Sequence, residues 1–226
     1  DVDRQVCTAK LPLIADPALK LAPNADLARK VYNGVVKRLS KNPDDRASAI
    51  KAEKKLQDRG FVAFVKDLPQ ETQEYLRNTP WKNFLPWRLA YKPSSLSTPV
   101  RPVFDGSMPT PSGESLKSIC VTGRNTLNPM VEIFIRWRSY DVAYHNDVNT
   151  MYNCIELESQ YWALQRYWWN DTLDPNLPPV EKVIKTLIYG CKASGNQAEH
   201  AIRLTASHFK DEFPEVNEVV QKDLYV

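Results

Sequence analysis

The stretch AYHNDVNTMYNCIEL, residues Ala143–Leu157, decides how the second half of the chain is interpreted. Within it, Asp147 has apolar residues on both sides, with Tyr144 before it and Val148 and Met151 after it. Aspartate favours turns, so one interpretation places Asp147 in a turn between two strands. The other places it at the end of one strand, as a carboxylate held there for a chemical role. The local pattern leaves both interpretations open.

The composition of the chain is that of a globular protein. Its 226 residues are 42% hydrophobic and 25% charged, which is enough to bury a sizeable core. The formal net charge of +3 permits a polyanionic partner without requiring one. The four cysteines lack metal-ligand spacing, which predicts reduced thiols in an intracellular protein. No apolar run is long enough to span a membrane, so we expect no membrane partner.

Hydrophobic periodicity predicts a mixture of helices and strands. Helices are expected at 26–41, 43–58, 69–78, 126–140 and 194–213. Strands are expected at 61–65, 84–92, 98–107, 142–148, 161–169, 180–190 and 222–226. These elements do not alternate regularly as they would in a doubly wound sheet, so the order favours an α+β fold.

Three details of the helices follow from the same pattern. Asn24 or Asp26 is the expected N-terminal cap of the first long helix. In the helix at 126–140, the side chains expected to face a core are Val131, Phe134 and Ile135. In the helix at 194–213, the expected buried stripe is Ala198, Ile202, Thr205 and Phe209.

Five blocks of sequence resemble one protein family. They are STPVRPVFDGSMPTPSGESLKSICVTG (97–123), DVNTMYNCIELE (147–158), LQRYWWND (164–171), IYGCKASGNQAEHA (188–201) and LYV (224–226). Their order and spacing resemble the reverse transcriptases of BEL/Pao-type LTR retrotransposons, from about Leu11 to Val226. The resemblance implies the right-handed polymerase fold. It implies a lead-in with two helices at 1–60, a fingers-like region at 61–139, and a partial palm at 140–226 that is interleaved with the fingers.

The resemblance assigns metal chemistry to Asp147. This residue matches the catalytic aspartate at the end of the first palm strand, and the carbonyl of Val148 matches a further metal contact. The implied reaction uses two divalent metal ions, Mg²⁺ or Mn²⁺, which carboxylate and phosphate oxygens bind. In the family an Asp-Asp pair that supplies the remaining carboxylates directly follows the LYV block. We therefore expect residues 1–226 alone not to polymerise DNA, and the metal to bind only in the complete enzyme.

Five residues match nucleotide-binding positions of the same family. Arg101 matches a fingers arginine that holds the triphosphate, a role that suits a guanidinium, and Lys92 supplies a second charge on that hairpin. Tyr152 matches an aromatic ring that leaves no room for a ribose 2′-hydroxyl. Tyr189 and Gly190 match an aromatic-glycine pair that packs under the nucleotide.

The resemblance also implies partners and a location. The partners are an RNA template, a DNA or RNA primer and deoxynucleoside triphosphates. The location is the cytoplasm, including virus-like particles, or the nucleus. A second interpretation stays open, because a fold does not by itself imply a function. In it the chain is a decayed or host-retained copy that has lost catalysis and binds nucleic acid or a protein partner, so whether the chain is an enzyme is undecided.

Overall fold

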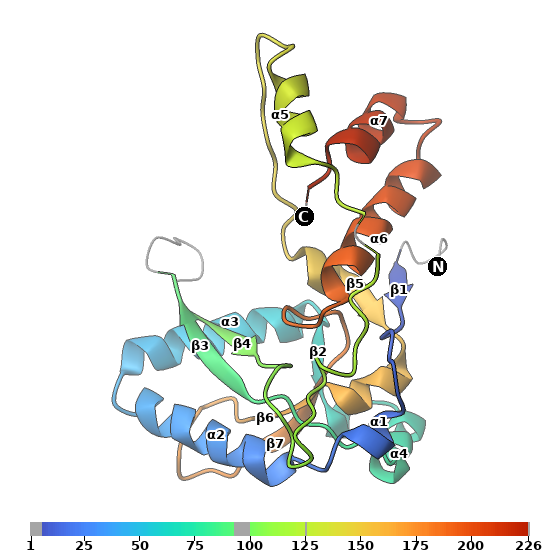
Figure 1. Ribbon diagram of the computed structural model, residues 1–226. Coiled ribbons are helices and arrows are strands. Elements are labelled where there is room, and N and C mark those ends of the chain that lie inside the picture. Colours follow the sequence, from blue (N-terminus) through green and yellow to red (C-terminus); the bar gives the residue numbers. More distant parts are fainter. Residues whose placement is uncertain (1–5, 93–99, 125, 226) are drawn as a thin grey trace.

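A computed structural model describes residues 6–92, 100–124 and 126–225. These residues form helices and three small sheets, which confirms the predicted α+β class. In Figure 1, α2 and α3 lie beside the hairpin of β3 and β4, and α5, α6 and α7 stand together at the opposite end of the molecule.

The central sheet contains three antiparallel strands in the order β2, β7, β6. They are β2 (Val62–Phe64), β7 (Val180–Ile184) and β6 (Arg166–Trp169). The predicted strands at 61–65 and 180–190 are confirmed in these parts. The predicted strand at 161–169 is confirmed only in its second half, because a 3₁₀ helix, η3 (Ser159–Leu164), occupies the first half.

Two smaller sheets have two strands each. β3 (Trp87–Tyr91) and β4 (Val100–Phe104) form an antiparallel hairpin, as predicted for 84–92 and 98–107, although residues 98 and 99 lie outside the described residues. β1 (Cys7–Ala9) pairs in parallel with β5 (Ile155–Leu157), which joins the start of the chain to the segment after Asp147.

The helices cover these sheets. They are α1 (Pro17–Lys20), α2 (Ala25–Leu39), α3 (Pro43–Asp58), α4 (Gln70–Asn78), α5 (Met130–Trp137), α6 (Ser194–His208) and α7 (Pro214–Asp223), with the 3₁₀ helices η1 (Val65–Asp67) and η2 (Met151–Cys154). All five predicted helices are present. Within the described ranges, no helix combines the length and the apolar character needed to cross a membrane.

One hydrophobic cluster forms most of the core. It takes residues from each of the predicted ranges 1–60, 61–139 and 140–226, so α2 and α3 pack into the same core as the sheets. Large aromatic rings fill its centre: Trp87 lies 5.0 Å from Trp169, measured between ring centroids, and both are about 1% exposed. Rings of this size bury much apolar area, so they dominate the stability of the core.

Asn24 does not cap α2 with its side chain. It stands at the N-cap position, but its amide accepts a hydrogen bond from the Phe84 N–H (2.7 Å) and donates one to the Phe84 carbonyl (2.8 Å). Asn24 is buried, and the polar atoms of its side chain bond with the backbone of Phe84, 60 residues away. Asn24 is therefore the N-cap residue, as predicted, but a tertiary contact takes the place of a side-chain cap.

The predicted strand at 142–148 is wrong. Residues 142–148 are irregular and exposed, and no strand of the described chain pairs with them. A strand needs a neighbour to satisfy its backbone groups, so an alternating pattern alone does not form one. The predicted strand at 222–226 is also wrong, since α7 extends to Asp223 and residues 224 and 225 are irregular; Val226 lies outside the described residues.

The buried faces predicted for the last helices are wrong in part. In α5, Val131, Phe134 and Ile135 are 50–68% exposed, and Ile133 is buried instead. Glu132 and Arg136 lie on one side of this helix, so its pattern does select an apolar face, but of that face only Ile133 is fully buried by the described chain.

In the predicted stripe at 194–213, only Ala198 is fully buried. Glu199 of α6 is buried beside it, because Arg203 (2.9 Å) and Thr126 (2.8 Å) bind its carboxylate. A charged residue thus occupies part of the buried face, which a hydrophobic pattern does not reveal.

A buried ion pair ties α3 to the central sheet. Lys182 on β7 and Glu53 on α3 are almost inaccessible, and their charged atoms lie 2.5 Å apart. Tyr167 donates to the same carboxylate (2.7 Å), and Lys182 also donates to Gln57 (2.6 Å). Burial, followed by the negative charge of Glu53, raises the pKa of Tyr167, so its hydroxyl stays a donor.

The Lys182→Met substitution should lower the free energy of unfolding by about 3–5 kcal/mol, because it leaves a buried carboxylate without its cation. Adding Glu53→Gln, which keeps an acceptor for Tyr167, should recover most of that loss. Urea denaturation of the two variants and the unchanged chain measures both effects. A loss below about 1 kcal/mol in the single variant would show that the pair is not needed for stability.

Candidate functional site

Backbone hydrogen bonds bring the segments after Asp147 and before Gly190 together. The Leu157 N–H donates to the Lys185 carbonyl (2.7 Å), and the Leu187 N–H donates to the Ile155 carbonyl (3.0 Å). These bonds pair the two segments in an antiparallel arrangement, so residues before 155 lie beside residues after 187.

The rings of Tyr152 and Tyr189 meet at the end of this pairing. Tyr152 lies in η2, and its ring centroid is 4.4 Å from that of Tyr189, with the rings at 69°. Burial, and then the neighbouring Tyr189, raise the pKa of Tyr152, which keeps its hydroxyl protonated. Two of the residues predicted to bind a nucleotide are therefore in direct contact, 37 positions apart in sequence.

Gly190 lets the same turn approach the end of β4. Its φ is +97°, a region that favours glycine, and a Cβ there would lie 3.8 Å from the Phe104 carbonyl. On the other side, a Cβ on Gly106 would lie 3.8 Å from the Gly190 carbonyl. The Tyr189–Gly190 turn thus packs against the end of the strand that carries Arg101.

Arg101 and Lys92 lie near the end of the hairpin at which the chain passes from β3 to β4. Arg101 pairs with Ala90 across the hairpin, and Lys92 follows two residues after Ala90. Both side chains are exposed, and neither makes a side-chain hydrogen bond or ion pair with any described residue. Arg101 is three residues before Phe104, which is about 10 Å along a strand. The positive charges of Arg101 and Lys92 are therefore available to bind an anion from solution.

Asp147 and Val148 lie in the irregular segment before η2, and both are exposed. The predicted position of Asp147 at the end of a strand is wrong, because that strand is not formed. Among the residues in the described ranges, no group of three or more His, Cys, Asp or Glu side chains is placed to hold a metal ion. One carboxylate and one carbonyl do not make a Mg²⁺ site on their own. Metal binding by Asp147 stays a prediction.

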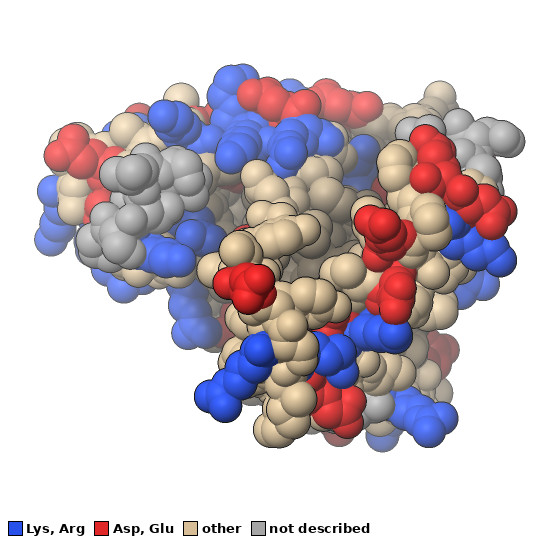
Figure 2. Space-filling view, turned by 90° about the horizontal axis from the view of Figure 1, so that it is seen from above, with Lys and Arg blue, Asp and Glu red and all other residues tan. Residues whose placement is uncertain are grey.

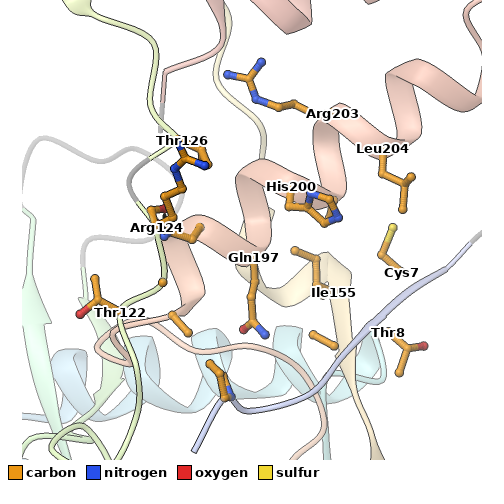
Figure 3. A pocket seen from close by; sticks show the side chains of 16 residues that line it. Cys7, Thr8, Thr122, Arg124, Thr126, Ile155, Gln197, His200, Arg203 and Leu204 are labelled. Carbon is orange, nitrogen blue, oxygen red and sulfur yellow. Dashed lines mark hydrogen bonds between the residues drawn. The ribbon is translucent and has the colours of Figure 1, made fainter.

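A cavity of about 630 Å³ lies beside this region, between β1, residues 122–124 with Thr126, and α6 (Figure 3). Two hydrogen bonds hold its walls: Gln197 donates to the Lys10 carbonyl (2.5 Å), and Asn196 donates to the Arg124 carbonyl (2.6 Å). This cavity was not predicted from the sequence, since its three walls come from segments more than 65 residues apart. Contacts of that range carry no local periodic signal.

The interior of the cavity is mainly apolar. Its walls include Ile155, Ala201 and Leu204, and Figure 3 shows His200 on the face of α6 that looks toward Cys7. Arg203 is directed away toward α7, where its guanidinium donates to the Gln221 carbonyl (2.6 Å). The cavity is therefore a hollow under α6 with an apolar interior and polar residues such as Thr8, Thr122 and His200 in its walls.

No family model matches the chain, and no curated protein matches its sequence significantly. A function therefore has to be inferred from the site itself. Of the predicted residues, Tyr152, Tyr189 and Gly190 are brought together, and Arg101 and Lys92 lie on the adjoining hairpin.

Gly123, in one wall of the cavity, should not tolerate a side chain. Its φ is +86°, and a Cβ would lie 2.7 Å from the Asn196 amide nitrogen. Gly123→Ala should therefore lower the free energy of unfolding by about 1–3 kcal/mol. Gly34→Ala, in the open middle of α2, is the matched control and should raise it by about 0.5–1 kcal/mol. Equal effects in thermal denaturation would contradict this account of Gly123.

Proposed function

We propose that the chain is the fingers and partial palm of an RNA-templated DNA polymerase of the reverse transcriptase type. The observation that carries the proposal is the contact of Tyr152 with Tyr189, in a turn that packs against the strand carrying Arg101. Three sequence blocks that resemble nucleotide-binding motifs are thus neighbours in space, although nothing in their local sequence requires it.

Each of these residues has a chemical role in the proposal. The guanidinium of Arg101 and the ammonium of Lys92 bind the triphosphate, because charge-assisted hydrogen bonds to phosphate oxygens are strong. The ring of Tyr152 lies under the sugar and collides with a 2′-hydroxyl, which selects deoxynucleotides. The absence of a side chain on Gly190 lets the backbone approach the nucleotide closely.

The proposed partners are a primer–template of RNA and DNA and deoxynucleoside triphosphates. Figure 2 shows Lys and Arg side chains in several groups on this face, with Asp and Glu side chains between them. Exposed lysines of α3 include Lys51, Lys54 and Lys55. Positive charge of this kind attracts a phosphate backbone through counterion release.

Binding of a divalent metal ion is an expected part of the proposed function. Asp147 and the Val148 carbonyl are the groups that would contact Mg²⁺ or Mn²⁺, and the metal would activate the attacking hydroxyl and stabilise the leaving phosphates. Asp147 alone is too small a donor set for two such ions. For residues 1–226 the proposed activity is therefore binding of nucleotide and primer–template, in advance of any chemistry.

One observation favours a second candidate function. Asp147 lies in an exposed irregular segment, and the described part of the chain has no metal-binding cluster beside it. A module that has lost catalysis and binds nucleic acid or a protein partner would need neither a strand to hold Asp147 nor a metal-binding cluster beside it. This candidate would be favoured by an affinity that is the same with or without the 2′-hydroxyl and the triphosphate, but that falls as the salt concentration rises.

Arg101→Ala should weaken binding of dTTP about tenfold, because it removes a charge-assisted contact to phosphate. Arg77→Ala is the matched control: Arg77 is an equally exposed arginine, on α4, and should leave the affinity unchanged. Isothermal titration of the full chain with dTTP measures both. If the two variants lose affinity equally, Arg101 has no specific role.

Tyr152→Ala should reduce the preference for dUTP over UTP, which differ only at the 2′ position, about tenfold, since it removes the ring that meets the 2′-hydroxyl. Tyr152→Phe keeps the ring and the contact with Tyr189, so it should keep the preference. Competition titrations of dUTP against UTP give the ratio for each variant. An unchanged ratio in Tyr152→Ala would remove Tyr152 from sugar selection.

A further inference from the structure

We propose that Arg59 is a positioning residue for the nucleotide site, and that it acts by holding Thr150 in a left-handed conformation. The functional half of this inference rests on the proposed function. The structural half concerns only the local conformation of residues 147–152, which can be measured without any nucleotide. Thr150 lies in the block at 147–158, but the resemblance assigned a role to neither residue.

Arg59 reaches the segment from the end of α3. It is the C-cap residue of that helix, and its guanidinium donates to the Thr150 hydroxyl at 2.9 Å. The guanidinium carbon also lies 5.4 Å from the centre of the Phe61 ring, which limits the directions that the side chain can take. The end of α3 and the ring of Phe61 thus direct the arginine side chain toward Thr150, which is 91 positions away in sequence.

Thr150 has an unfavourable backbone conformation. Its φ is 55° and its ψ is 33°, the left-handed region, which β-branched residues rarely adopt. A conformation of this kind persists only where surrounding contacts determine it. The hydrogen bond from Arg59 is one such contact, and the Cys154 N–H bond to the Thr150 carbonyl (3.1 Å) is another.

The backbone conformation of Thr150 determines how the segment that carries Asp147 is oriented relative to η2. Asp147 lies three residues before it, and η2 with Tyr152 begins directly after it. Relaxation of Thr150 to an extended or right-handed conformation would rotate η2 relative to the segment that carries Asp147. Tyr152 would then lose its position against Tyr189. Arg59 therefore controls the geometry of the site without lying in it.

Direct contact of Arg59 with a phosphate is the competing explanation, because the side chain is exposed. The two roles differ in one respect. If Arg59 acts through the conformation of Thr150, it becomes dispensable when residue 150 is glycine, which adopts the left-handed region freely. A phosphate contact would remain necessary in that background.

The first experiment measures hydrogen exchange of the full chain without nucleotide. Arg59→Ala should speed exchange of the amides in 150–154 about tenfold, because a locally strained segment loses one of the hydrogen bonds that hold it in place. Arg46→Ala is the matched control: Arg46 is also on α3 and donates to the Thr172 carbonyl at 2.7 Å, so it should leave 150–154 unchanged. In the Thr150→Gly background, Arg59→Ala should change exchange less than about twofold.

Two results of this experiment would overturn the inference. One is exchange in 150–154 that is the same in Arg59→Ala as in the unchanged chain. The other is an effect of Arg59→Ala that is as large in the Thr150→Gly background as in the original one. Either would show that Arg59 does not act through the conformation of Thr150.

The second experiment measures the preference for dUTP over UTP, two nucleotides that differ only at the 2′ position. Arg59→Ala should reduce this ratio about threefold, and the Thr150→Gly background should restore it. If the unchanged chain binds neither nucleotide, the proposed function fails while the exchange result still decides the structural half. If the unchanged chain discriminates and Arg59→Ala leaves the ratio intact, the inference about Arg59 fails while the proposed function stands.

Discussion

The hydrogen bonds that pair residues 155–157 with residues 185–187 determine the geometry of the candidate site. They join β5 to the residues directly after β7 through an isolated antiparallel bridge between Glu156 and Thr186, and β1 pairs with β5. The contact of Tyr152 with Tyr189 and the approach of Gly190 to β4 both follow from this register. The buried pair of Lys182 and Glu53 fixes β7 against α3, so the helix that carries Arg59 is held in the same frame.

Much of the fold follows from local sequence. Periodic apolar residues predicted α2 and α3. The strand predicted at 142–148 failed because a strand depends on a partner, which a local pattern cannot supply. The buried face predicted for α5 was wrong for a related reason: an apolar face is buried only where neighbouring elements cover it, and a local pattern does not show those neighbours.

The site was predictable to a lesser extent. The spacing from Asp147 to Tyr152 and the pair Tyr189–Gly190 were visible in the sequence through resemblance to a family of polymerases. Their meeting in space depends on backbone pairing between distant segments. The cavity under α6 and the contact of Arg59 with Thr150 left no trace in the sequence, because each joins residues that are individually ordinary.

The most direct test of the account is photo-crosslinking of the full chain with a photoreactive deoxyadenosine triphosphate, followed by peptide mass spectrometry. If the contact of Tyr152 with Tyr189 marks a deoxynucleotide site, labelled peptides should contain these two residues, and excess dATP should prevent labelling far better than excess ATP. Labelling confined to the walls of the cavity under α6, or equal protection by the two nucleotides, would contradict it.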